Sequence, residues 1–181
     1  IGKYDDRHRG AATRRARPPG PAPHSAVPLT SSPVAATVTA MDIHAFMETY
    51  KRAWETSDEH LLASLFAPDG VYHNTPFAEQ VGHEAIKAYW QRTKLQSDIR
   101  LTYEVIHAHP GGGVAHWHTT YQVTSEELFR IWAASTGTNL LARRDGDPLP
   151  RLALDGVAVA EWGADGLCRH FRIWWHSRVA G

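Results

Sequence analysis

The sequence predicts an α+β fold in which three N-terminal helices cover one face of a curved sheet. Two observations lead to this fold class. Between residues 42 and 90, large apolar residues recur every three to four positions, which is the period of an amphipathic helix. From residue 100 onward, apolar and polar residues alternate between glycine-rich turns, as in a series of strands. Because such a sheet closes over a cavity, we expect the chain to hold a small molecule.

Three segments carry the helical period. The first follows Asp42, whose charge suits a helix N-terminus, and its apolar stripe consists of Ile43, Phe46, Tyr50 and Trp54. Ser57 is expected to cap a second helix, which Pro68-Asp69-Gly70 ends and which carries Leu61, Leu62, Leu65 and Phe66. The third helix begins after Gly82, and its predicted inner face consists of Ile86, Tyr89 and Trp90.

The later segments are predicted as strands, at residues 100–108, 114–123, 152–162 and 167–176. Turns at residues 110–113 and 163–166 separate them in pairs. The segment 125–151 interrupts this pattern. It contains a short helical stretch at residues 126–134 followed by glycine and proline turn signals, and we expect a surface excursion there rather than a lid.

The first 40 residues combine arginine clusters with many prolines and show neither a helical nor a strand period. Such a segment cannot bury enough apolar surface to offset its ordering entropy, which predicts a disordered leader. We favour upstream sequence that is not translated, with Met41 as the natural start. Residues 41–178 are then expected to form one domain.

Composition narrows the classes of function. The formal net charge is zero, from 19 basic and 19 acidic residues, so there is no general electrostatic basis for nucleic-acid binding. No apolar run approaches the roughly 18 residues of a membrane helix. The single cysteine, Cys168, excludes an intramolecular disulfide and favours a reducing, cytoplasmic location. No cofactor is expected.

Short motifs follow one another in a set order from residue 41 to residue 177: Tyr50, Trp54, Ser57-Asp58, Leu65 to Asp69, Tyr72 to Phe77, Gly82, Ala85-Ile86, Tyr89-Trp90, Leu154 to Gly156, Asp165-Gly166 and Trp174 to His176. In this order they resemble the SnoaL-like branch of the nuclear transport factor 2-like superfamily. The resemblance implies a cone-shaped fold, with the three helices packed on a strongly curved, mostly antiparallel sheet. It also implies a homodimer formed through the outer face of that sheet. Because the superfamily includes isomerases, polyketide cyclases, dehydratases, hydrolases and non-catalytic binding modules, the fold alone does not decide the function.

Strand parity and the resemblance together predict the side chains that line the cavity. On the segment 114–123, the face that carries Trp117 and Tyr121 is expected to point inward. The predicted ligand-binding residues are Trp54, Tyr72, Trp90, Trp117, Thr119, Tyr121, Trp162 and Trp175. They favour a small, largely apolar organic ligand, although tryptophans at such positions are also typical of a packed core.

Tyr50, Asn74 and Glu104 are the candidates for chemistry. Tyr50 matches the oxyanion-hole tyrosine of the superfamily's steroid isomerases, whereas Asn74 stands in place of their general base and cannot take a proton. Parity turns Glu104 inward as a possible base, and a solvated glutamate is the commoner arrangement. The hypothesis is cofactor-independent proton transfer of the isomerase or cyclase type, with Tyr50 and Asn74 as polarising donors. The alternative is a non-catalytic ligand-binding or dimeric assembly module.

A second alternative is a metal site on two His-x-His pairs. A four-residue turn at 110–113 would place His109 opposite Val114 and bring onto one face His107, His109, His116 and His118. Neutral imidazoles in such an arrangement can bind zinc. A solvated histidine patch is the commoner outcome of this motif.

Overall fold

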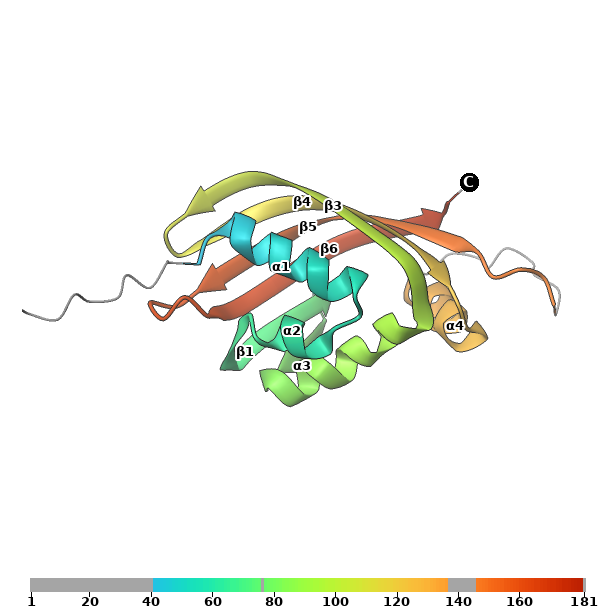
Figure 1. Ribbon diagram of the computed structural model, residues 1–181, viewed down its shortest axis with the longest axis horizontal. Coiled ribbons are helices and arrows are strands. Elements are labelled where there is room, and N and C mark those ends of the chain that lie inside the picture. The colour runs from blue at the N-terminus through green and yellow to red at the C-terminus, as the bar shows by residue number, and fades with distance from the viewer. Residues whose placement is uncertain (1–40, 76, 137–145, 181) are drawn as a thin grey trace, which may run out of the picture. The chain divides into compact units, whose positions relative to one another are not determined.

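Figure 1 shows the computed structural model, which describes residues 41–75, 77–136 and 146–180. Its helices are α1 (Ile43–Glu55), α2 (Glu59–Ala63), α3 (Gly82–Trp90), the 3-10 helix η1 (Gln91–Leu95) and α4 (Glu126–Thr136). Its strands are β1 (Phe66–Thr75), β2 (Ala78–Val81), β3 (Gln96–His109), β4 (Gly112–Val123), β5 (Arg151–Trp162) and β6 (Cys168–Val179). The leader predicted at residues 1–40 lies outside the described residues, as do residues 137–145 of the predicted excursion.

The described strands form one six-stranded sheet in the order β2-β1-β6-β5-β4-β3. The β1–β6 pair is parallel and the other pairs are antiparallel. The sheet bends strongly, and α1, α2 and α3 lie along one of its faces (Figure 1). This arrangement confirms the predicted α+β fold, with three N-terminal helices on a curved and mostly antiparallel sheet.

The first helix forms as its sequence predicts. The side chain of Asp42 accepts a hydrogen bond from the backbone N–H of Ala45 at 2.8 Å, which caps the helix N-terminus. The buried face of α1 contains the predicted stripe together with two neighbours: Ile43, Phe46, Met47, Tyr50, Ala53 and Trp54. Burial of this face anchors α1 against the sheet.

The second helix is shorter than predicted. Asp58, not Ser57, caps it by accepting hydrogen bonds from the next turn, and the helix ends at Ala63. Phe66 already belongs to β1, so the prediction that Pro68-Asp69-Gly70 ends a helix is wrong. The pairing of β1 with β6 shifts register between Phe66 and Val71, and an irregular stretch of this kind tolerates a proline that cannot donate to the ladder.

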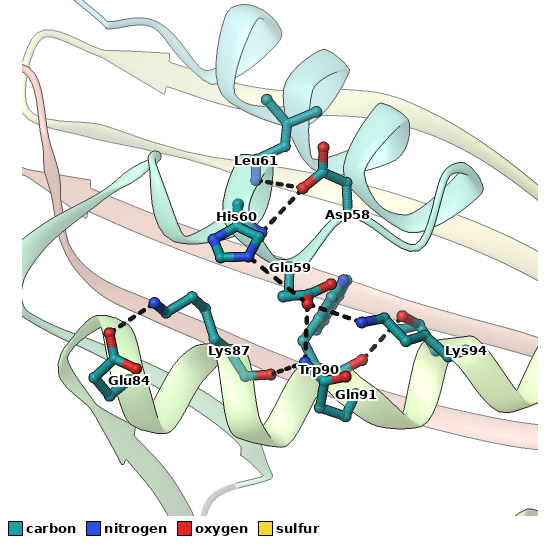
Figure 2. Close-up of polar contacts among 10 residues, drawn as sticks. Asp58, Glu59, His60, Leu61, Glu84, Lys87, Trp90, Gln91 and Lys94 are labelled. Carbon is teal, nitrogen blue, oxygen red and sulfur yellow. Dashed lines mark hydrogen bonds and ion pairs between the residues drawn. The ribbon is translucent and has the colours of Figure 1, made fainter.

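Glu59 joins α2 to the segment that follows α3 (Figure 2). Its Oε1 accepts hydrogen bonds from Lys94 Nζ at 2.8 Å and from Gln91 Nε2 at 3.0 Å. The bond from Lys94, followed by the bond from Gln91, lowers the pKa of Glu59 from 4.5 to about 2. The carboxylate therefore holds η1 against α2 in its charged form.

We expect Lys94→Met to lower the free energy of unfolding by about 0.5–1 kcal/mol at pH 7, the range of partly solvated ion pairs. Because the pKa of Glu59 is lower in the folded chain, its pairing stabilises the fold above pH 4.5 and is lost as the pH falls towards about 2. The stability difference in urea unfolding should therefore shrink over that range. Lys87→Met is the control. Its partner Glu84 is 90% exposed, so this variant should lose less free energy of unfolding at pH 7 than Lys94→Met. A difference that stays constant with pH would contradict this role of Glu59.

The outer face of the sheet carries Asp155, opposite His118, and Trp174, opposite Val157. Trp174 is 46% exposed, an unusual degree for a tryptophan on a sheet. The homodimer through this face stays a prediction. Light scattering on the full chain tests it by measuring the molar mass in solution.

No helix among the described residues is long and apolar enough to cross a membrane.

Candidate functional site

A pocket lies on the inner side of the sheet. The cavity volume, taken as the space that the centre of a water molecule can occupy, is about 90 Å³. One water needs roughly 10–15 Å³ on the same measure, so the pocket is several times larger. The side chains around it are mostly aromatic or aliphatic: Trp54, Tyr72, Asn74, Tyr89, Trp90, Arg92, Thr93, Gln96, Trp117, Tyr121, Leu128, Ile131, Trp132, Leu154, Ile173 and Trp175. The pocket is therefore large enough, and apolar enough, for a small organic molecule.

Hydrogen bonds hold three of these tryptophans in position. Trp54 Nε1 donates to Gln96 Oε1 at 2.8 Å, and Trp175 Nε1 donates to the carbonyl oxygen of Asn74 at 3.0 Å. Trp132 Nε1 donates to Ser177 Oγ at 2.6 Å, which ties α4 to β6 beside the pocket. Each bond fixes an indole ring, so the walls around it are formed before any ligand arrives.

The other two tryptophans of the lining keep an unused donor. Trp90 and Trp117 are buried, and among the described residues their Nε1 atoms have no hydrogen-bond partner. An unsatisfied N–H in an apolar surrounding costs free energy unless an acceptor reaches it.

Tyrosines form another part of the wall. Burial raises the pKa of Tyr72 and Tyr121 well above the ordinary value and raises that of Tyr89 to about 12. All three phenols are therefore protonated at neutral pH and can donate a hydrogen bond. The positive charge of Arg92 acts on the same three phenols in the opposite direction, towards lower pKa, but burial outweighs it.

The structure brings together most of the predicted site. The predicted residues that line the pocket are Trp54, Tyr72, Asn74, Trp90, Trp117, Tyr121 and Trp175. Tyr50 and Thr119 are fully buried but do not line it, and the Tyr50 hydroxyl lies 3.4 Å from that of Tyr72. Trp162 does not line it either, because its Nε1 donates to the carbonyl oxygen of Pro110 at the turn between β3 and β4.

The predicted inward position of Glu104 is wrong. The pairing of β3 with β4 shifts between Val105 and His107, so that Ile106 is an extra residue in β3. One extra residue exchanges the two faces of a strand. Glu104 consequently lies opposite His116 on the outer face, exposed to solvent, where it cannot reach a ligand in the pocket.

The predicted four-residue turn is wrong. Because β4 already begins at Gly112, the pairing of the histidines differs from the prediction by two residues, while their predicted common face is kept. His107 lies opposite Val114, and His109 lies opposite Gly112 in the turn region. His116 and His118 instead contact Asp155, at 2.9 Å and 3.5 Å, on the outer face. Within the part of the chain that the structure describes, no three histidine, cysteine or acidic side chains converge as metal ligands.

Several lining residues were not among the predicted site residues: Tyr89, Arg92, Thr93, Gln96, Leu128, Ile131, Trp132, Leu154 and Ile173. The spacing of Leu128, Ile131 and Trp132 marks one face of the short helix predicted at 126–134, so a helical stripe was available as a signal. Arg92 and Gln96 belong to the 3-10 turn and its cap, where no period reveals which side chains face inward.

Known proteins resemble this chain in sequence pattern and in structure. Residues 43–171 match the family described as the SnoaL-like domain. No curated protein is detectably similar in sequence. Three solved structures match this chain over 90–95% of their own length, with 11–14% sequence identity. At this level of identity, the matches show the fold.

One of these structures is a putative polyketide cyclase of Pseudomonas putida, 14% identical over 73% of this chain and 90% of its own, with a TM-score of 0.52. A second is RV0760c of Mycobacterium tuberculosis, 13% identical over 75% of this chain and 93% of its own, with a TM-score of 0.54. A third is SalBIII, an epoxide hydrolase/cyclase-like enzyme with a role in pyran ring formation in the polyether salinomycin. It is 11% identical over 76% of this chain and 95% of its own, with a TM-score of 0.54.

Proposed function

Because the chain belongs to the SnoaL-like domain family, we propose that it binds a small, largely apolar organic molecule in the pocket between its helices and its sheet. The observation that carries this proposal is a lining of tryptophan, tyrosine and aliphatic side chains punctuated by a few polar groups. Removal of apolar ligand surface from water contributes roughly 25 cal/mol per Å², and the polar groups orient the ligand.

The proposal concerns binding and polarisation of the ligand rather than proton transfer. Glu104, the residue expected to act as the base, lies on the opposite face of the sheet. Tyr50, the expected oxyanion donor, lies behind Tyr72 and does not line the pocket. Asn74 does line it, and its amide can donate a hydrogen bond to a ligand carbonyl. This arrangement favours the ligand-binding module over the isomerase or cyclase.

Native mass spectrometry of the full chain, compared with its mass after denaturation, tests the proposal directly. We expect a small organic adduct that is lost on denaturation, or one that forms on addition of aromatic compounds. Ile131→Trp should abolish the adduct, because Ile131 lines the pocket from α4 and a larger ring there fills the space. Ile131 is 42% exposed, so the variant is expected to fold normally.

Ala134→Trp is the matched control for this variant. Ala134 is exposed on the same helix and does not line the pocket, so the added ring should leave binding unchanged. Equal adduct formation by wild type and Ile131→Trp would place the ligand elsewhere on the chain and would contradict the proposed site.

A further inference from the structure

Resting on the proposed function, we infer that the ligand is an organic carboxylic acid whose carboxylate is held by Arg92 and Gln96 while its apolar body lies among the tryptophans. Both residues line the pocket, Arg92 within η1 and Gln96 at the cap of η1. The inference deepens the proposed function by assigning the chemical class of the ligand.

Arg92 is placed by its own helix and keeps most of its hydrogen-bonding capacity. Its Nε donates to the carbonyl oxygen of Tyr89 at 3.0 Å, and its guanidinium lies 3.7 Å from the centre of the Tyr89 ring. These contacts use Nε and one face of the group. Neither Nη atom has a hydrogen-bond or ion-pair partner among the described residues. The group is thus held still with four N–H donors unused.

Half-burial makes this unpaired charge significant. Arg92 is partly buried at the pocket, whereas an exposed arginine is fully hydrated and needs no partner. Elsewhere in the fold, half-buried guanidinium groups have carboxylate partners. Arg151 contacts Asp98 at 2.8 Å, and Arg172 contacts Glu161 at 2.8 Å. At Arg92 the corresponding acceptor is missing among the described residues, and a ligand carboxylate would supply it.

Gln96 adds donors in a known orientation. The indole N–H of Trp54 can only donate, so the atom of Gln96 that lies 2.8 Å from it must be the amide oxygen. The NH₂ group of Gln96 therefore points away from Trp54, and no described residue accepts a hydrogen bond from it. The pocket thus has an amide donor at the cap of the same 3-10 turn that positions the guanidinium.

The rest of the pocket suits the same ligand class. The described lining residues include no aspartate or glutamate that would repel an anion. A planar guanidinium matches a carboxylate in two parallel hydrogen bonds. One guanidinium balances the single negative charge of a carboxylate, and the aromatic walls accommodate a ring or chain attached to that carboxylate.

The test compares ligands that differ only in the group that Arg92 would hold. Benzoate and cinnamate are titrated into the full chain at pH 7, each against its primary amide, with tryptophan fluorescence and calorimetry as readouts. In the wild-type protein, we expect each acid to bind at least about tenfold more tightly than its amide, the effect of a charge-assisted hydrogen-bond pair. This comparison leaves the protein unaltered, so it does not depend on how any variant folds.

Variants at Arg92 then locate the preference. Arg92→Met keeps the packing of the stem on Tyr89 and should weaken binding of the acids about ten- to a hundredfold while changing the amides less than about twofold. Arg92→Lys keeps the charge but cannot donate two parallel hydrogen bonds. Its affinity for the acids should lie between those of the wild type and Arg92→Met. Arg100→Met removes the same charge from an exposed position beside Asp98, outside the pocket, and should change neither ligand.

The outcomes separate the inference from the proposed function. Equal affinity of acid and amide for the wild type would overturn the carboxylate assignment and leave the apolar pocket intact, as would equal weakening of both by Arg92→Met. If neither ligand class binds, or if Ile131→Trp leaves their binding unchanged, the pocket itself is not the site and both conclusions fall.

Discussion

Replacing Gly156 by alanine is expected to lower the free energy of unfolding by about 3 kcal/mol, the upper part of the range for overpacking a core. A Cβ built at this position would lie 2.8 Å from Trp117 Cζ2 and 2.9 Å from Trp175 Cβ. It would also collide with the carbonyl oxygen of Trp174, a backbone atom that cannot turn aside. Urea unfolding followed by tryptophan fluorescence measures the change.

Gly111→Ala provides the control for this prediction. Apart from its two neighbours in the chain, a Cβ at Gly111 would come no closer than 3.8 Å to any atom, so the substitution should change stability by less than about 0.5 kcal/mol. The contrast identifies the constraint at Gly156 as space rather than loss of a flexible glycine. A loss below about 1 kcal/mol at Gly156 would show that Trp117 and the β6 backbone move aside easily, and the pocket wall would then be softer than the structure indicates.

Gly156 also shows why part of the site can be predicted from sequence. The strand partners of Gly156 are Trp117 on β4 and Trp175 on β6, two of the pocket tryptophans. A residue without a side chain between two indole rings gives both rings room on the inner face. Alternation along β4 predicts the inward position of Trp117 correctly, because the β4–β5 ladder runs without interruption from Gly112 to Gln122.

Where the ladder is interrupted, parity gives the wrong face. Ile106 is an extra residue in β3, and it reverses the expected position of Glu104. The residues around Ile106 contain no glycine or proline that would mark a bulge. A one-residue irregularity thus removed the only carboxylate from the predicted site, although the fold class was unaffected.

The polar end of the pocket escaped prediction for a different reason. Arg92 and Gln96 lie in and just after η1, a turn of five residues with the sequence QRTKL. Segments this short have no hydrophobic stripe to define an inner face, and an arginine there is ordinarily a solvated surface residue. Only the contacts with Tyr89 and Trp54 reveal that these side chains face the pocket.

Phe171→Ala is expected to cost about 3–5 kcal/mol of the free energy of unfolding, as for other large aromatic residues removed from a core. Phe171 on β6 is fully buried, and its ring centre lies 5.1 Å from those of Phe46 and Tyr50 and 5.4 Å from that of Tyr72. It therefore joins α1 to β1 through one aromatic cluster. Phe77→Ala is the control, since Phe77 is 97% exposed and should contribute almost nothing.

This last substitution also separates stability from binding. Phe171 does not line the pocket, yet it supports Tyr72, which does. Under conditions where the variant stays folded, it should bind the ligand with affinity reduced by less than about tenfold, whereas Ile131→Trp should abolish binding at wild-type stability. If Phe171→Ala instead abolished binding while the chain stayed folded, the aromatic cluster behind Tyr72 would be part of the site, and Tyr50 would return as a candidate for contact with the ligand.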